Sequence, residues 1–198
     1  MAKAPKQSVI VEQKHPFEDG VGIISSKGIF YVSLRMDRFL NFSTALIPFV
    51  IWLDSLDEAQ QVILSVVTPR NVPAYGPHEY ITLIGALLRC KAHISIKMDH
   101  YEPTQASYLY LAADTVIAYP AGAIFFGPTT NVVQNDTVEV KPVFIPFINS
   151  LVDRALASGF LSSREADAIR NSTPIGLMYK DIVSRDLSVP HTGLDIRE

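Results

Sequence analysis

The sequence predicts an α/β fold with a mostly parallel sheet and flanking helices, and two observations support this. Extended apolar runs alternate along the chain with segments whose apolar residues recur at helical spacing. The run Val62–Val67 is continuous and rich in β-branched residues, which is typical of a parallel strand buried on both faces. Strands that alternate with helices in this way indicate right-handed crossovers between parallel strands.

Length and composition fit one domain with a substantial core. The chain has 198 residues, of which 48% are hydrophobic and 19% charged, and its net charge is −3. A disordered chain would be poorer in apolar residues, and a slightly acidic chain is a poor candidate for nucleic-acid binding through a basic face. The single cysteine, Cys90, excludes a disulfide framework and a cysteine metal site.

No segment of the sequence has the length and character of a membrane span. The most apolar stretch is Ala45–Leu53, whereas a span needs about 20 apolar residues. The start of the chain, Met1–Lys14, is polar and contains three lysines. We therefore expect a cytoplasmic protein that binds neither membranes nor nucleic acids.

The N-terminal third of the chain predicts a tail, two strands and a helix. Residues 1–20 begin with a Lys- and Pro-rich stretch and read as a flexible tail. Two strand-like runs follow, Val21–Ser25 and Gly28–Leu34, with two polar residues between them. The apolar residues of Thr44–Leu56 lie at helical spacing, and Pro48 falls near the start of that helix, where proline is tolerated.

The middle of the chain continues the alternation. Tyr, Leu and Ile residues form an apolar stripe along a helix at His78–Leu88, and Ala92–Met98 reads as the next strand. Small and aromatic residues predict a helix at Gln105–Ala113. Two short strands are then expected at Val116–Tyr119 and Ala123–Phe126.

The C-terminal part predicts an extended arm and two helices. The arm is expected at Val132–Val140, and an amphipathic helix at Val143–Ser158. A further helix at Ser162–Arg170 begins with serines that can act as N-caps, and Glu165 is placed to reach back to the cap. Residues 188–198 read as a second tail.

Three segments together resemble the Clp protease proteolytic subunit, within the wider ClpP/crotonase fold. They are VILSVVTPRNVPAYGPHEYITLIGALL, ISIKMDHYEPTQASYLYLAAD and TVIAYPAGAIFFGPTT, and the likeness runs from about Ile29 to Asp181. The resemblance implies repeated ββα-type units with a mostly parallel sheet, flanking helices and a protruding handle. It also implies a domain over 21–187 with the handle at about 128–160.

The resemblance places the family's catalytic triad on residues that cannot form one. The serine position falls on Thr104, the histidine position on Gly127, and the acid position near Gly176, in a segment without Asp or Glu. Because Gly127 has no side chain to accept a proton, serine-type acyl transfer lacks its base. We therefore expect no catalytic residue at these positions.

The positions that would bind an oxyanion or a peptide are altered as well. The resemblance places them at Asn71, Val72 and Gln105. The sequence thus predicts a catalytically inactive ClpP-like subunit with a structural or regulatory role, without cofactor or metal. Such a subunit is expected in a homo-oligomeric ring of six or seven members, with an active ClpP-type subunit or a Clp ATPase as a further partner.

Two other interpretations use residues at the end of the strand Ala92–Met98. In the first, Asp99 and His100 supply a base and Ser107 a nucleophile for a peptidase or other hydrolase, although a solvated polar loop explains the same residues. In the second, a crotonase-type acyl-CoA enzyme needs only two backbone N–H groups and an acid, for which Glu102 is the candidate. A metal site is less favoured, because adjacent residues on a strand point to opposite faces.

Overall fold

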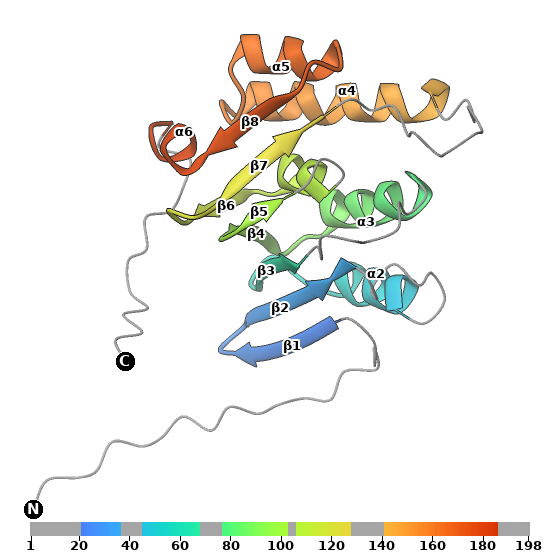
Figure 1. The fold of residues 1–198 in the computed structure, drawn as a ribbon. Helices are drawn as coiled ribbons and strands as arrows, with labels where there is room; N and C mark the ends of the chain where they lie inside the picture. The colour runs from blue at the N-terminus through green and yellow to red at the C-terminus, as the bar shows by residue number, and fades with distance from the viewer. Residues whose placement is uncertain (1–20, 37–44, 68–76, 103–105, 128–140, 186–198) are drawn as a thin grey trace, which may run out of the picture.

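The computed structural model describes residues 21–36, 45–67, 77–102, 106–127 and 141–185. Figure 1 shows two sheets with helices packed beside them. The predicted tails, the arm at 132–140 and the first part of the predicted handle, 128–140, fall outside the described residues.

The larger sheet has five strands in the order β1-β2-β3-β4-β6. Their bounds are Val21–Ser26 for β1, Ile29–Arg35 for β2, Gln61–Val67 for β3, His93–Met98 for β4 and Thr115–Ala118 for β6. Strand β1 is antiparallel to β2, and the other neighbours are parallel. The predicted α/β class with a mostly parallel sheet is therefore confirmed.

A two-residue turn joins β1 to β2. The ladder closes at the pair Ser26 and Ile29, and the turn residues Lys27 and Gly28 have φ values of 51° and 80°. Tight hairpin turns of this kind need positive φ at both central positions, which glycine adopts without steric cost.

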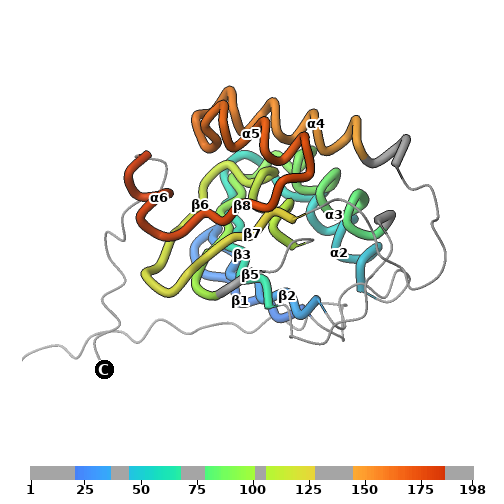
Figure 2. Tube along the Cα trace, turned by 45° about the horizontal axis from the view of Figure 1, so that its top comes forward, coloured from blue at the N-terminus to red at the C-terminus, as the bar shows by residue number. Residues whose placement is uncertain are grey.

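The smaller sheet has three strands in the order β5-β7-β8. Strand β5 (Tyr101–Glu102) is parallel to β7 (Ala123–Phe126), and β7 is antiparallel to β8 (Ile175–Met178). Neither β5 nor β8 was expected from the sequence. Figure 2 shows β7 and β8 running side by side beneath α4 and α5.

The helices form a row in which each contacts the next. This row consists of α2 (Ile47–Asp54), α3 (Pro77–Arg89), the 3₁₀ helix η2 (Ala106–Ala112) and α4 (Lys141–Ala157). Figure 1 shows α2 and α3 on the same side of the larger sheet. The predicted helices at these places are confirmed, but the third is a 3₁₀ helix whose seven residues are all buried.

The C-terminal helices α5 (Ser163–Arg170) and α6 (Tyr179–Val183) flank β8. The predicted cap of α5 is confirmed: the Ser162 hydroxyl accepts from the Glu165 N–H, and the Glu165 carboxylate accepts from the Ser162 N–H. Helix α6 was not predicted. None of the helices in the described part of the chain is both long enough and apolar enough to cross a membrane.

The prediction that Val62–Val67 is buried on both faces is wrong. In β3, Val62, Leu64 and Val66 are buried, whereas Ile63 and Ser65 are only partly covered. Across the sheet, Val32, Leu64, Ile96 and Val116 pair on one row and are all buried. The face that carries Val32, Leu64, Ile96 and Val116 is thus the main core face of the sheet, although Ser95 on the other face is also buried.

Candidate functional site

An aspartate and a histidine meet where the chain leaves β4. The Asp99 carboxylate lies 2.5 Å from Nδ1 of His100, and the two side chains are 35% and 36% exposed. Adjacent residues on a strand would point to opposite faces, but Asp99 and His100 both follow the end of β4, and the chain bends at His100. The alternation of a strand no longer applies at a bend, so the two side chains can come together.

The turn between β6 and β7 holds this corner in place. The Tyr119 N–H donates to the Met98 carbonyl at 3.0 Å, and the Ala123 N–H donates to the His100 carbonyl at 3.1 Å. Gly122 packs so closely that an added Cβ would lie 1.9 Å from the Met98 carbonyl oxygen. A side chain at this position is therefore excluded, and the backbone around His100 is fixed from both sides.

The surroundings of Tyr119, which include Asp99, shift the pKa of its phenol. Partial burial, and secondarily the negative charge of Asp99, raise the pKa of Tyr119 above its ordinary value of 10.0. The phenol therefore stays protonated at neutral pH. An aspartate and a neutral phenol thus lie at the carboxyl ends of β4 and β6, where open parallel sheets place their ligands.

The Asp99–His100 pair can act as a base with a defined tautomer. A carboxylate that accepts the Nδ1 proton leaves the electron pair of the imidazole on Nε2. Nε2 is covered by protein, while other atoms of the ring reach the surface. A substrate group can therefore reach Nε2 only if the atoms that cover it move aside.

Ser107 does not have the environment of a nucleophile. It is fully buried in η2, and its Oγ accepts a hydrogen bond of 3.2 Å from the Phe125 N–H of β7. Its role is to join η2 to the smaller sheet. The predicted grouping therefore holds for Asp99 and His100 but not for Ser107.

Several predicted site residues fall outside the described residues. These are Asn71, Val72, Thr104 and Gln105, together with the side chain of Glu102, whose backbone pairs with Ile124 in the smaller sheet. Among the described residues, no three His, Cys, Asp or Glu side chains group as metal ligands would.

The two glycines at predicted triad positions both belong to the region of β7 and β8. Gly127 directly follows β7 and is buried, and Gly176 pairs with Phe125 across β7 and β8. A Cβ at Gly176 would lie 2.9 Å from the Phe125 ring. Packing of that ring accounts for Gly176 without reference to catalysis.

The fold is similar to that of solved acyl-CoA enzymes. The chain resembles an enoyl-CoA hydratase from Mycobacterium avium subsp. paratuberculosis K-10, with a TM-score of 0.54, 16% identity, and coverage of 86% of this chain and 70% of that one. A monofunctional enoyl CoA isomerase from M. smegmatis is similar with a TM-score of 0.54 and 15% identity, over 86% of this chain and 75% of that one. An enoyl-CoA hydratase/isomerase family protein from Silicibacter pomeroyi is similar with a TM-score of 0.56 and 12% identity, over 85% of this chain and 73% of that one.

At these identities the likeness shows the fold, which is crotonase-like. A scan against models of protein families gives no match, and neither does a search of curated proteins. The predicted crotonase-type fold is confirmed, whereas membership of the Clp protease family is not supported.

The predicted function, an inactive ClpP-like subunit, is wrong. The similar structures named above are enoyl-CoA hydratase or isomerase family proteins, not Clp protease subunits. The alternative of a peptidase or hydrolase finds no support among them either, and the buried Ser107 lacks the exposure of a nucleophile. The ring of six or seven subunits and the Clp-type partners are likewise unsupported by these comparisons.

Proposed function

We propose that this protein is a crotonase-fold enzyme that moves a proton on the carbon next to the carbonyl of an acyl thioester. The observation that carries the proposal is the Asp99–His100 pair, fixed at the carboxyl end of β4. The fold similarity to enoyl-CoA hydratases and isomerases supports the substrate class. A carbon acid next to a thioester needs a base, and a histidine oriented by a carboxylate is such a base.

In this proposal Nε2 of His100 accepts the proton and Asp99 holds the ring in the required tautomer. Because Nε2 is covered by protein, this proposal requires that substrate binding uncover it. The negative charge that develops on the thioester oxygen needs backbone N–H donors. We assign these to the segments around Asn71 and Gln105, which follow β3 and precede η2.

The test follows the proton directly. The purified protein is incubated in D₂O with butyryl-CoA and with crotonyl-CoA. Deuterium at the carbon next to the carbonyl is read by mass spectrometry, and hydration of the double bond by loss of ultraviolet absorbance. We expect catalysed exchange with at least one thioester, and we expect His100→Gln to slow it about 10²-fold or more.

The matched control is His93→Gln. His93 lies at the opposite end of β4, where its Nε2 contacts the Thr115 hydroxyl at 2.9 Å, and its loss should leave exchange unchanged. If Glu102→Gln abolishes exchange while His100→Gln does not, Glu102 is the base and the role of His100 is wrong. Absence of exchange with both thioesters would reject the proposed reaction.

A further inference from the structure

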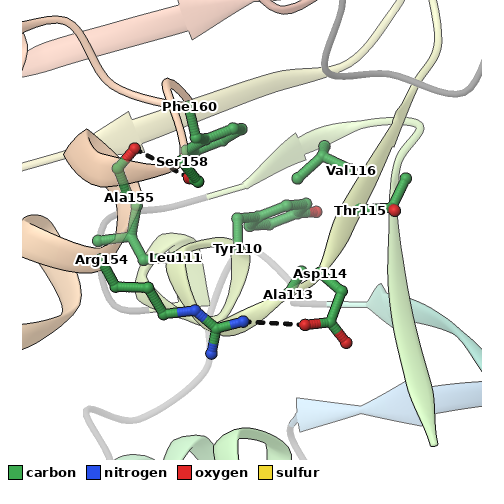
Figure 3. A pocket seen from close by; sticks show the side chains of 10 residues that line it. All are labelled: Tyr110, Leu111, Ala113, Asp114, Thr115, Val116, Arg154, Ala155, Ser158 and Phe160. Atoms are coloured by element: carbon green, nitrogen blue, oxygen red, sulfur yellow. Dashed lines mark hydrogen bonds and ion pairs between the residues drawn. The ribbon is translucent and has the colours of Figure 1, made fainter.

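A cavity of about 220 Å³ lies at the amino end of β6. Figure 3 shows its walls, which come from η2, the first residues of β6, the end of α4 and Phe160. Tyr119 follows the other end of this four-residue strand, and strands rise about 3.3 Å per residue, so the length of β6 separates the two places. The cavity is therefore distinct from the Asp99–His100 corner.

The end of α4 builds one wall. Gly159, with a φ of 77°, ends the helix, and the Leu161 N–H donates back to the Ala155 carbonyl at 3.1 Å. This turn brings Phe160 against the core, where it is 7% exposed. Arg185 fixes the turn further by donating to the Phe160 carbonyl at 2.6 Å.

Small side chains leave the space open. Ala113 after η2 and Ala155 on α4 both line the cavity, beside the rings of Tyr110 and Phe160. Tyr110 is held because its hydroxyl donates to the Lys97 carbonyl at 3.0 Å. The larger part of the lining is thus apolar, with the hydroxyl groups of Thr115 and Ser158 among its polar part, and the rings of Tyr110 and Phe160 form part of its wall.

An ion pair stands at the edge of this apolar space. Nη2 of Arg154 lies 2.9 Å from Oδ1 of Asp114, and each side chain is 39% exposed. The other Asp114 oxygen accepts from the Ile94 N–H at 2.9 Å. Both oxygens of Asp114 are therefore engaged, whereas Nε and Nη1 of Arg154 have no hydrogen-bond partner among the residues that the structure describes.

We infer that this cavity binds a small carboxylate with a short apolar tail. Unused guanidinium N–H groups favour a carboxylate at the mouth, because Arg presents paired donors that match two oxygens. An ammonium ligand would instead have to pair with Asp114, where the Arg154 cation already lies. At about 30 Å³ per water-sized group, the volume accommodates about seven non-hydrogen atoms.

Isovalerate, with seven non-hydrogen atoms, is the probe, and isovaleramide is its neutral counterpart of equal size. Binding to the full chain is measured by isothermal titration calorimetry. We expect saturable binding of isovalerate at one site, and binding of isovaleramide that is about 10-fold weaker or undetectable, because hydrogen bonds to charged groups contribute more than neutral ones. Equal binding of the two probes, or no saturable binding of isovalerate, would overturn the inference.

Two variants locate the site. Arg154→Gln removes the cation and should weaken isovalerate binding about 10-fold or more. Ala113→Leu fills the cavity from its partly exposed rim and should abolish binding, with folding checked by thermal melting. The control Arg164→Gln changes an exposed arginine on α5 and should have no effect. Unchanged binding in a folded Ala113→Leu protein would show that the ligand lies elsewhere.

This inference does not depend on the proposed function. Its probes carry no thioester, and its variants lie at the opposite end of β6 from the Asp99–His100 corner. Failure of the exchange assay would leave the binding result standing, and failure of the binding assay would leave the proposed reaction untouched.

Discussion

The two ends of strands β4 and β6 differ in how closely the chain packs around them. At the carboxyl ends, Gly122 lies so close to Met98 that not even a methyl group fits. At the amino end of β6, Ala113 and Ala155 leave a cavity of about 220 Å³. The two ends of β6 therefore offer different surroundings. The tightly packed end can position a base, and the end with the cavity can hold a ligand.

Replacing a glycine at each end tests this contrast most severely. Gly122→Ala puts a Cβ 1.9 Å from a backbone oxygen that cannot rotate away, so we expect a loss of about 3 kcal/mol or more in the free energy of unfolding. Gly159→Ala meets no atom within 4 Å and carries only the strain of its positive φ, about 1–2 kcal/mol. Urea unfolding measures both. Equal losses would show that the corner is not tighter than the end of α4.

A smaller effect is expected from the ion pair behind the cavity wall. Arg185 donates to both the Phe160 carbonyl and the Glu165 carboxylate, each at 2.6 Å. Burial alone would raise the pKa of Glu165, but the hydrogen bonds from Ser162 and the contact with Arg185 outweigh it and lower that pKa below 4.5. Glu165→Gln should therefore lower the free energy of unfolding by about 1–2 kcal/mol at pH 7.

The pH dependence of that loss has a definite sign. Because the pKa of Glu165 is lower in the folded state, its carboxylate stabilises the fold at neutral pH, and this contribution disappears as the pH falls through the folded-state pKa below 4.5. The difference between wild type and Glu165→Gln should shrink over that range in urea unfolding at a series of pH values. Asp167→Asn, which removes an exposed ion pair with Arg170 on the same helix, should change stability by less than about 0.5 kcal/mol. If the stability difference between wild type and Glu165→Gln stays constant with pH, the lowered pKa of Glu165 is wrong.

The sequence predicted the elements that local patterns determine. Repeating apolar residues gave α3 and β3, and the pairing of Ser162 with Glu165 gave the start of α5, because both signals lie within a few residues. Strand β5 has only two residues, and β8 exists because it pairs with β7, so neither has a local pattern to detect.

Of the two candidate sites, one has a local signal in the sequence and the other depends on contacts between distant residues. Asp99 and His100 are adjacent in the chain, and their polar character at the end of a strand marked them as candidates. Arg154 and Asp114 are 40 residues apart, and only the packing of α4 against η2 brings them together. The wrong functional prediction arose from a likeness between folds that the Clp and crotonase families share, since such a likeness does not specify chemistry.

The smallest expected effect concerns the charge at the rigid corner. Asp99→Asn removes the negative charge that contributes to the raised pKa of Tyr119, so that pKa should fall toward, but not reach, its ordinary value of 10.0, because burial remains the main cause. Titration of ¹³C-labelled tyrosine by NMR measures the change. An unchanged Tyr119 pKa would mean that Asp99 does not face the phenol.

The order of strands in the larger sheet also bears on how the chain folds during synthesis. Strands β1, β2, β3, β4 and β6 stand side by side in the order in which the ribosome makes them. A hairpin such as β1–β2 forms in about 1–10 μs, whereas the ribosome adds only about 5–20 residues per second. Each later strand therefore emerges next to a completed neighbour. Strand β8 is different, because α4 and α5 are synthesised between it and β7, so the smaller sheet can close only after both helices have been made.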